Sequence, residues 1–494
     1  MNQFKKNCVM VVDFGTSGVR AVLIDISNGI TVVSASTKYP MITEKHGYSE
    51  IDPEVLWNAS VRCVEEVIRK AADVVDICCL TFSWFGDNLI LLNSAKQTLT
   101  RIVLGFDCRG ENEAEWIAQQ LGDGRFEQIT GCKCEGMCTG SKILWFRRNQ
   151  PEIYTAAAHF WTCQQYVCYR LGIDPINDIT MASRKCLMDV GNRTWSSELL
   201  NLIGIKEEQL GTIVESDTIV GKINHYGSVS LNKEIPVMAG AHDSDCGIVG
   251  TGVYSEKQQT AGEIAGTFDH IGFLSSEACT NTAILPEEHF CSYCGPIQNT
   301  WISFGAFPTS GAMLEWFMRE MFGCVSQEQF SELWNNVKAD ATEKVICIPD
   351  ISSGDAAFMN ISFSDTRISM FEAMIESLTF EARRVLESCM SRRKDSITRV
   401  RIGGGASRSD KWAQLRANVF GCSVERMETT EVSALGAAMI AATALGFHSS
   451  IEHAAEQMVR TEKVFEPEEK TMQKYQKKYN EYLLVKEINN SKNN

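Results

Sequence analysis

The feature that most constrains the fold is a strand–turn–strand pattern that occurs twice in the chain. The first copy runs from Val9 to Asp25 and has the turn Asp13-Phe14-Gly15-Thr16-Ser17-Gly18 between two apolar runs. The second copy, from Gln259 to Phe273, has Gly266-Thr267 at the equivalent place. The repeat predicts two related domains, and a cleft between two such domains is a favourable place for a ligand.

Helix and strand patterns alternate along the rest of the chain and predict an α/β layer architecture. A third strand follows the hairpin dipeptide Asn28-Gly29. Asp52 followed by Pro53 is typical of the start of a helix. Periodicity predicts mostly helices between residues 111 and 212, including one over residues 160–171.

The position of the second copy predicts where the chain divides. Residues 1–253 are the predicted first domain, residues 254–455 the second domain, and residues 456–494 a helical tail. The tail is charged, and its tyrosines at helical spacing predict that it packs against a domain. These tyrosines are Tyr475, Tyr479 and Tyr482.

The charge balance excludes several classes of partner. Lys and Arg number 47 and Asp and Glu number 62, which gives a net charge of −15. So acidic a chain is a poor ligand for nucleic acid or for an anionic membrane. No apolar run reaches the roughly 18 residues of a membrane span. The first residues do not resemble a secretory signal, so we expect a cytoplasmic protein whose 19 cysteines are reduced.

The first turn has the composition of an anion-binding site. Gly15 lets backbone N–H groups turn inward, Thr16 and Ser17 add hydroxyl donors, and Arg20 supplies a positive charge. Asp13 offers hard oxygen ligands that can hold Mg²⁺ through water. With the turn of the second copy, these residues fit two loops that clamp the phosphate chain of a nucleotide. An ordinary polar hairpin turn would have the same composition.

The second half of the chain offers further candidate contacts for a nucleotide. A glycine run at residues 403–405 joins a predicted strand to a helix, where a planar ring could approach the backbone closely. Gly311 lies at another predicted helix start, and either segment could equally serve packing alone. The candidate nucleotide contacts in this half are Gly266, Thr267, Gly311, Gly404, Gly405 and Ser409.

Asp243 is the candidate catalytic base. It follows a predicted strand over residues 236–239, and carboxylates at strand ends commonly face ligand clefts. A carboxylate there can accept the proton of a hydroxyl that attacks phosphorus. Asp245 and His242 compete for this role, and His242 is more simply interpreted as a hydrogen-bonded structural histidine.

Two groups of cysteines have spacings that are similar to those of metal sites. Cys291 and Cys294 form a CxxC pair, and Cys132, Cys134 and Cys138 lie close together in the sequence. A zinc site needs four convergent ligands, and the CxxC pair falls in a predicted strand, where its thiols would point to opposite faces. We therefore interpret both groups as buried free thiols.

Taken together, these motifs resemble those of the FGGY family of carbohydrate kinases. The first turn resembles the family's phosphate turn, and residues 48–53 (YSEIDP) resemble its W-x-E-x-D-P run. Residues 106–109 (FDCR) are similar to its x-D-x-R motif, and residues 141–145 (SKILW) to its T-K-I-x-W helix. Residues 239–243 resemble the segment with the family's catalytic aspartate. The resemblance covers roughly residues 8–485.

The resemblance implies two actin-like, ribonuclease-H-type domains with ATP and Mg²⁺ in the cleft between them. It implies transfer of a phosphoryl group from ATP to a hydroxyl of a small sugar or polyol, with Asp243 as the base. Because similar kinases are often dimers, a homodimer is compatible with it.

The substrate region departs from the family pattern. Phe85 and Gly86 replace polar or long residues, and Asp87 stands where xylulose kinases have histidine and glycerol kinases have glutamate. His242 stands where the family usually has glycine. Hexulose, pentulose and polyol substrates therefore stay open, with a ketopentose such as xylulose slightly ahead. The predicted substrate contacts are Phe85, Asp87, Asp107 and Asp243.

Two other hypotheses compete with a sugar kinase. An actin-like ATPase or interaction protein would have the same phosphate turns, but Asp87, Asp107 and Asp243 favour a small hydroxylated substrate. A degenerate kinase would bind a sugar without turnover, and the altered segment around Phe85 keeps that hypothesis open.

Overall fold

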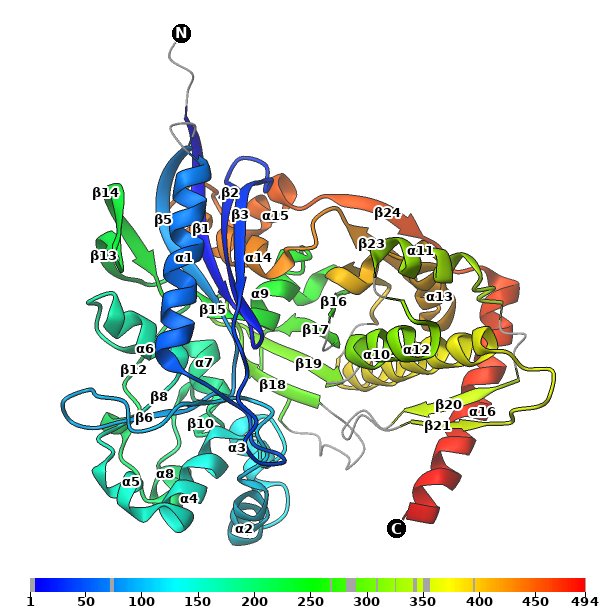
Figure 1. Ribbon diagram of the computed structural model, residues 1–494, viewed down its shortest axis with the longest axis horizontal. Coiled ribbons are helices and arrows are strands. Elements are labelled where there is room, and N and C mark those ends of the chain that lie inside the picture. Colours follow the sequence, from blue (N-terminus) through cyan, green and yellow to red (C-terminus); the bar gives the residue numbers. More distant parts are fainter. Residues whose placement is uncertain are drawn as a thin grey trace.

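Two mixed β-sheets form the centres of two lobes (Figure 1). The computed structural model describes residues 5–71, 75–266, 269–280, 290–307, 310–324, 326–340, 344–349, 356–393 and 396–493. The sheet of the first lobe has the strand order β13-β14-β5-β1-β2-β3, and β15 pairs with β5. Its strands are β1 (Lys6–Phe14), β2 (Gly18–Asp25), β3 (Thr31–Lys38), β5 (Val75–Trp84), β13 (Ile219–Tyr226), β14 (Val229–Met238) and β15 (Ala241–His242).

The sheet of the second lobe has the strand order β18-β19-β17-β16-β22-β23-β24. Its strands are β16 (Thr260–Ala265), β17 (Asp269–Ser275), β18 (Phe290–Cys294), β19 (Trp301–Phe307), β22 (Arg399–Gly403), β23 (Ser423–Met427) and β24 (Thr461–Phe465). In both sheets three strands run antiparallel (β1–β2–β3 and β16–β17–β19), and the first of them pairs in parallel with a later strand, β5 or β22. The predicted duplication is therefore confirmed.

Strand β1 shows why an apolar run forms the centre of the first sheet. Val9 and Val11 pack into a core shared with residues of the second half of the chain, such as Ala438. Met10 and Val12 pack into the core on the opposite face of the sheet. Because successive side chains of a strand point to opposite faces, a continuous apolar run is what a strand buried on both faces requires.

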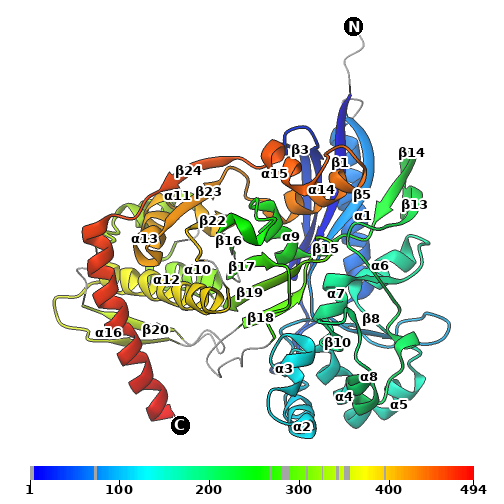
Figure 2. The ribbon, with the colours of Figure 1, turned by 180° about the vertical axis from the view of Figure 1, so that it is seen from behind.

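Helices cover these sheets. In the first lobe α1 packs against β2 and β3, and Asp52 accepts the Glu54 N–H at 2.8 Å at its predicted start. In the second lobe α12 packs against β17 and β19. The C-terminal α16 packs against α12 and α13 and runs along the outer edge of this lobe (Figure 2), with its three predicted tyrosines buried. These helices are α1 (Pro53–Ala71), α12 (Arg367–Ser391), α13 (Asp410–Phe420) and α16 (Glu469–Asn493).

A helical insert extends the first lobe below its sheet (Figure 1). The predicted helix over residues 160–171 begins only at Cys163, because His159–Trp161 form β8, which pairs with β6 (Ile90–Leu92). The side chain of Gln165 accepts the Thr162 N–H at 3.1 Å and fixes the helix start there. The helices of the insert are α2 (Glu111–Leu121), α3 (Arg125–Thr130), α4 (Thr139–Asn149), α5 (Pro151–Ala156), α6 (Cys163–Arg170), α7 (Ile179–Arg184) and α8 (Ser197–Ile203).

The remaining elements are short strands and peripheral helices. In the described part of the chain, none of the helices is both long and apolar enough to cross a bilayer. These elements are β4 (Glu50–Ile51), β7 (Ile102–Val103), β9 (Ile176–Asp178), β10 (Met188–Asp189), β11 (Thr194–Trp195), β12 (Thr212–Val214), β20 (Ile346–Pro349), β21 (Ala356–Met359), α10 (Ser310–Phe322), α11 (Gln327–Asn335) and α15 (Ile451–Met458).

The two lobes meet where α9 (Asp243–Gly250) crosses α14 (Val432–Ala444). Each helix also packs on the sheet of the other lobe: α9 contacts β16 and β17, and α14 contacts β1 and β5. Glycines make the crossing close. A Cβ atom on Gly250 would overlap the Val432 carbonyl oxygen, and one on Gly436 would overlap the Cys246 carbonyl oxygen. The backbones themselves are therefore in contact at this junction.

Candidate active site

A cavity of about 410 Å³ lies between the two lobes, next to the start of α9. This volume is within the range of about 300–1,000 Å³ that is typical of small-molecule sites. The first lobe supplies most of its wall and the second lobe closes it. The wall includes Gly15, Thr16, Ser17, Phe85, Gly86, Asp87, Gly105, Arg184, His242 and Asp243 from the first lobe, and Ile264, His270, Tyr293, Phe304 and Ser433 from the second half of the chain.

The first predicted phosphate turn forms one end of the cavity. It joins β1 to β2, and the Gly15 N–H donates to the Gly18 carbonyl at 2.9 Å. Thr16 and Ser17 line the cavity, as an anion-binding turn requires. Arg20 does not line it. Its guanidinium forms an ion pair with Glu431, which precedes α14, so it joins β2 to the second half of the chain.

Asp13 stands at the end of β1, close to this turn. Burial raises the pKa of Asp13 to about 7, and the charges of Asp243 and Glu431 add to the rise, whereas Ser83 and Arg20 oppose it. Carboxylates that repel one another in this way suit a divalent cation, since Mg²⁺ prefers oxygen ligands and keeps several of its waters. The residues present therefore fit the predicted Mg²⁺.

Asp243 is the first residue of α9 and lines the cavity with about a third of its side chain exposed (34%). Its competitor Asp245 is fully buried and paired with Arg184 at 2.8 Å. Burial alone would raise the pKa of Asp245, but Arg184 and His242 hold it below its usual range. Asp245 is therefore committed to an internal ion pair, and of the two carboxylates it is Asp243 that a substrate can reach.

Asp87 lines the cavity and is held in an unusual backbone conformation. Its φ of 55° lies in the left-handed region, which non-glycine residues seldom adopt. The Lys142 ammonium donates to the Asp87 carbonyl at 2.9 Å and to the Gly105 carbonyl at 3.0 Å, which ties two segments of the wall together. Burial raises the pKa of Asp87, and Arg184, His242 and Lys142 partly offset the rise.

Two departures from the family pattern, Gly86 and His242, lie against each other. A Cβ atom on Gly86 would come within 2.5 Å of His242 Nε2, so the absence of a side chain at Gly86 makes room for the imidazole. The ring is hydrogen-bonded on its other side, where His242 Nδ1 lies 3.0 Å from the Ser244 hydroxyl. This agrees with the interpretation of His242 as hydrogen-bonded, although it also lines the cavity beside Asp243.

Asp107 is not brought to the cavity. It is fully buried, its two oxygens each accept a hydrogen bond from Arg109 at 2.8 Å, and the Ser49 N–H donates to it at 2.7 Å. Its neighbours Gly105 and Phe106 line the cavity instead. The geometry therefore does not support a contact between Asp107 and a substrate. It gives Asp107 the role of holding the segment that forms the wall.

The candidate nucleotide contacts of the second lobe gather at one end of its sheet. Gly266 follows β16, and Gly404 follows the neighbouring strand β22 with a φ of 94°. A Cβ atom on Gly404 would lie 2.5 Å from the Ala265 carbonyl oxygen, so only glycine fits there. Gly311 lies in the first turn of α10, and Ser409 caps α13 by accepting the Trp412 N–H at 3.3 Å. Thr267 lies outside the described residues.

Arg184 is a cavity residue that the sequence analysis missed. It ends α7, and its guanidinium lies 4.5 Å from the ring centres of both Tyr293 and Phe304, which belong to the second sheet. It thus joins the first lobe to the second within the cavity wall. His270 beside it has its pKa lowered to about 3 by burial and by Arg184 and His242, so its ring is neutral. The one sequence signal that could have drawn attention to Arg184 is that it is the single charged residue of α7.

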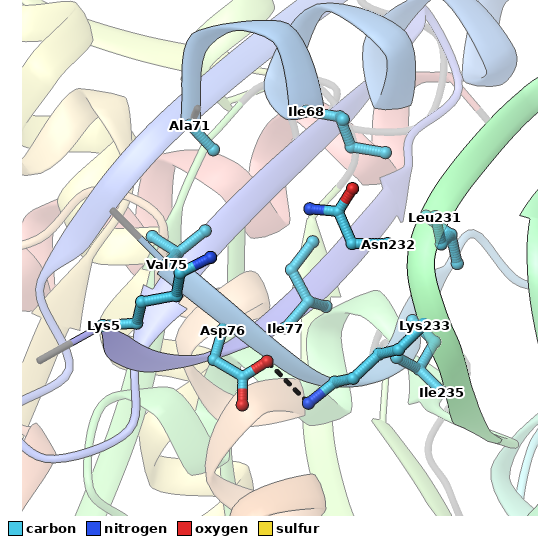
Figure 3. Close-up of a pocket in the computed structure, with 10 residues that line it drawn as sticks. All are labelled: Lys5, Ile68, Ala71, Val75, Asp76, Ile77, Leu231, Asn232, Lys233 and Ile235. Carbon is cyan, nitrogen blue, oxygen red and sulfur yellow. Dashed lines mark ion pairs between the residues drawn. The ribbon is translucent and has the colours of Figure 1, made fainter. Parts of the chain in front are cut away.

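A second cavity, of about 250 Å³, lies at the other end of β5 (Figure 3). Residues at the end of α1 and in strand β14 line it, and so do Asp76 and Lys233, which form an ion pair of 2.6 Å. It is smaller than typical small-molecule sites and lies away from both phosphate turns. The cavity between the lobes is the candidate active site because the first phosphate turn and Asp243 both line it.

Known proteins share this architecture over nearly the whole chain. Models of the N-terminal and C-terminal domains of the FGGY family of carbohydrate kinases match residues 8–250 and 265–445. The chain belongs to this family. A xylulose kinase of Bacillus subtilis (strain 168) is 28% identical over 499 residues, covering 97% of this chain and 98% of the relative. Solved structures of a ligand-bound xylulose kinase and of a gluconate kinase, both from Lactobacillus acidophilus, each have a TM-score of 0.88 at 22% identity and cover 98% of both chains.

This membership confirms the predicted enzyme class. The protein is a carbohydrate kinase that uses ATP. The likeness to the solved structures confirms the predicted α/β fold with two actin-like domains. The competing hypothesis of an actin-like ATPase without sugar chemistry is therefore set aside.

We predict that Gly86 and His242 are coupled. Gly86→Ala should displace the imidazole and lower kcat/KM for the accepted sugar on the order of 10- to 100-fold, since small misplacements in an active site are costly. In a His242→Gly background the same substitution should cost much less, because the clash is gone. A steady-state double-mutant cycle measures this, with Gly191→Ala as a control whose Cβ would meet only Asp189 at 3.4 Å. Equal losses in both backgrounds would contradict the coupling.

Proposed function

We propose that the protein transfers the γ-phosphoryl group of ATP to a hydroxyl of a ketopentose such as xylulose. The observation that supports this most is the position of Asp243, at the start of α9 and in the wall of the same cavity as Gly15, Thr16 and Ser17. A base and a phosphate turn facing one cavity are what phosphoryl transfer to a bound hydroxyl requires. Relatives named xylulose kinase match nearly the full length of the chain.

In the proposed reaction Asp243 accepts the proton of the attacking hydroxyl. The phosphates of ATP lie between the turn of Gly15 to Ser17 and that of Gly266-Thr267, and the rest of the nucleotide lies near residues 311, 404, 405 and 409. Asp13 would hold Mg²⁺ through water, and the ion would neutralise charge on the phosphates. Asp87 and Phe85 contact the sugar. Arg20, in its pair with Glu431, positions the first turn.

We propose the corresponding division of the chain as well. Residues 1–253 bind the sugar and supply the base, and residues 254–455 bind the nucleotide. The prediction that residues 456–494 are a wholly helical tail is wrong, because β24 (Thr461–Phe465) joins the edge of the second sheet before the packed helix α16 begins. A homodimer and a cytoplasmic location stay predictions from the sequence.

The proposed function is tested by ADP release from ATP and Mg²⁺ with a panel of xylulose, ribulose, fructose, glycerol and gluconate. We expect little hydrolysis without sugar, because closure of the two lobes excludes water, and the highest kcat/KM with a ketopentose. Equal ADP release with and without every sugar would contradict sugar phosphorylation. A higher kcat/KM with glycerol or gluconate than with a ketopentose would contradict only the choice of substrate and not sugar phosphorylation itself.

We predict that Asp243→Asn lowers kcat by roughly 10²–10⁴-fold, as expected for loss of a general base. ATP affinity, measured by equilibrium binding, should stay close to that of the unmodified protein. Asp174→Asn, at an exposed position outside the cavity wall, is the matched control. Near-normal turnover of Asp243→Asn would remove Asp243 from the mechanism.

Phe85 is buried and lines the cavity, so its ring occupies space that a polar residue would leave open. We predict that Phe85→Gln changes the ranking of substrates, measured as kcat/KM across the same panel. A uniform loss with the ranking unchanged would show that Phe85 supports the wall without selecting the sugar.

A further inference from the structure

Three cysteine thiols from three separate segments meet in the wall of the active-site cavity. Cys132 follows α3, Cys138 precedes α4, and Cys186 follows α7, and all three line the cavity. Each is at least 97% buried, with exposed fractions of 3%, 3% and 1%. The sequence spacing pointed to Cys134 as the third member, but its Sγ instead donates to the Ala114 carbonyl at 3.3 Å. Cys186, distant in the sequence, takes its place.

The sulfur atoms are spaced as the ligands of one metal ion. All three Sγ atoms lie within 4.8 Å of one another, and those of Cys132 and Cys186 are 3.6 Å apart. A Zn–S bond of about 2.3 Å in a tetrahedral site places sulfur ligands about 3.8 Å apart. Among the described residues no other trio of His, Cys, Asp or Glu side chains is gathered as closely.

Cys186 and Cys138 each have a notable backbone setting. Cys186 has a φ of 55°, in the left-handed region, where a non-glycine residue is held only by surrounding structure and is often functional. Cys138 is the N-cap of the 11-residue helix α4, and its side chain makes no capping hydrogen bond. A thiolate at a helix N-terminus is stabilised by the helix dipole.

We propose that Cys132, Cys138 and Cys186 bind one thiophilic metal ion of the Zn²⁺ class, with the fourth coordination position open to the cavity. Soft thiolate ligands select such an ion over Mg²⁺. Four convergent protein ligands are the requirement of a structural zinc site, whereas three protein ligands with an open fourth position is the arrangement of zinc sites that bind a water or substrate oxygen. Binding releases the thiol protons to solvent, since the thiolate is the ligand.

Cobalt(II) is the probe for this site, because its visible and near-ultraviolet bands report tetrahedral thiolate coordination. The reduced full-length protein should take up one equivalent of Co²⁺ with sulfur-to-cobalt charge-transfer bands. One equivalent of Zn²⁺, but not excess Mg²⁺, should remove these bands. Added azide should shift them, because the fourth position is open. The measurement needs neither ATP nor sugar, so its outcome is independent of the proposed function.

Serine variants assign the ligands. Cys132→Ser and Cys186→Ser should each lose the charge-transfer bands, whereas Cys63→Ser should keep them. Cys63 is a suitable control because it is equally buried and its Sγ lies 3.2 Å from the Thr37 hydroxyl, a partner that serine also satisfies. Absence of the bands in the unmodified protein, or their survival in both variants, would overturn the proposal. Insensitivity to azide would overturn the open position.

A second measurement uses the unmodified protein, so that the proposal is tested even where the serine variants fail to fold. Alkylation rates of single cysteines, followed by peptide mass mapping, should fall for Cys132, Cys138 and Cys186 when Zn²⁺ is present. The exposed Cys108 should react equally in both conditions. Equal labelling of the three thiols with and without Zn²⁺ would overturn the site.

Discussion

The active site depends on the contact between the backbones of α9 and α14. Gly250 and Gly436 lie where any side chain would overlap a carbonyl oxygen of the partner helix. The crossing therefore has no side chains between the two backbones and fixes how far apart the helices can lie. Asp243 begins α9 and Ser433 lies in the first turn of α14, and both line the cavity. One close crossing thus places a residue from each half of the chain at the same cavity.

A buried ion pair then decides which carboxylate stays reachable. Arg184 is 5% exposed and would be costly to bury without an acidic partner. Asp245 supplies that partner at 2.8 Å, and the rings of Tyr293 and Phe304 pack on the guanidinium. Because Asp245 compensates the charge of Arg184, Asp243 is not needed in that ion pair and its carboxylate faces the cavity. Through its contacts with these two rings, Arg184 also joins the first lobe to the second sheet.

The parts that could be predicted from the sequence are those fixed by local backbone requirements. The run from Val9 to Val12 alternates between two cores and so had to be a central strand. Gly404 had to be glycine because of its φ and its contact with Ala265. The start of α6 at Cys163 could not be placed by periodicity, because the hydrogen bond from Thr162 to Gln165 overrides the apolar pattern there.

The cavity wall around Asp87 could be predicted only in part: Phe85, Asp87 and Asp243 belong to it as predicted, whereas Asp107 does not and Arg184 was missed. Its side chains come from segments far apart in the chain, and only the fold decides which of them meet. The x-D-x-R motif pointed to Asp107, yet Arg109 and Ser49 donate hydrogen bonds to its two oxygens. Asp107 therefore holds the wall segment in place. Arg184 and Cys186 carried no sequence signal that placed them together with Asp87 or Cys132.

Phosphate binding by backbone N–H groups demands glycine and tight turns, which a sequence displays. Sugar recognition by side chains requires only that these side chains meet in the folded protein, so the residues have no fixed spacing along the sequence. The family could therefore be identified from motifs, whereas a contact such as that between Gly86 and His242, where the absence of a side chain at one residue makes room for the ring of the other, is visible only in the fold.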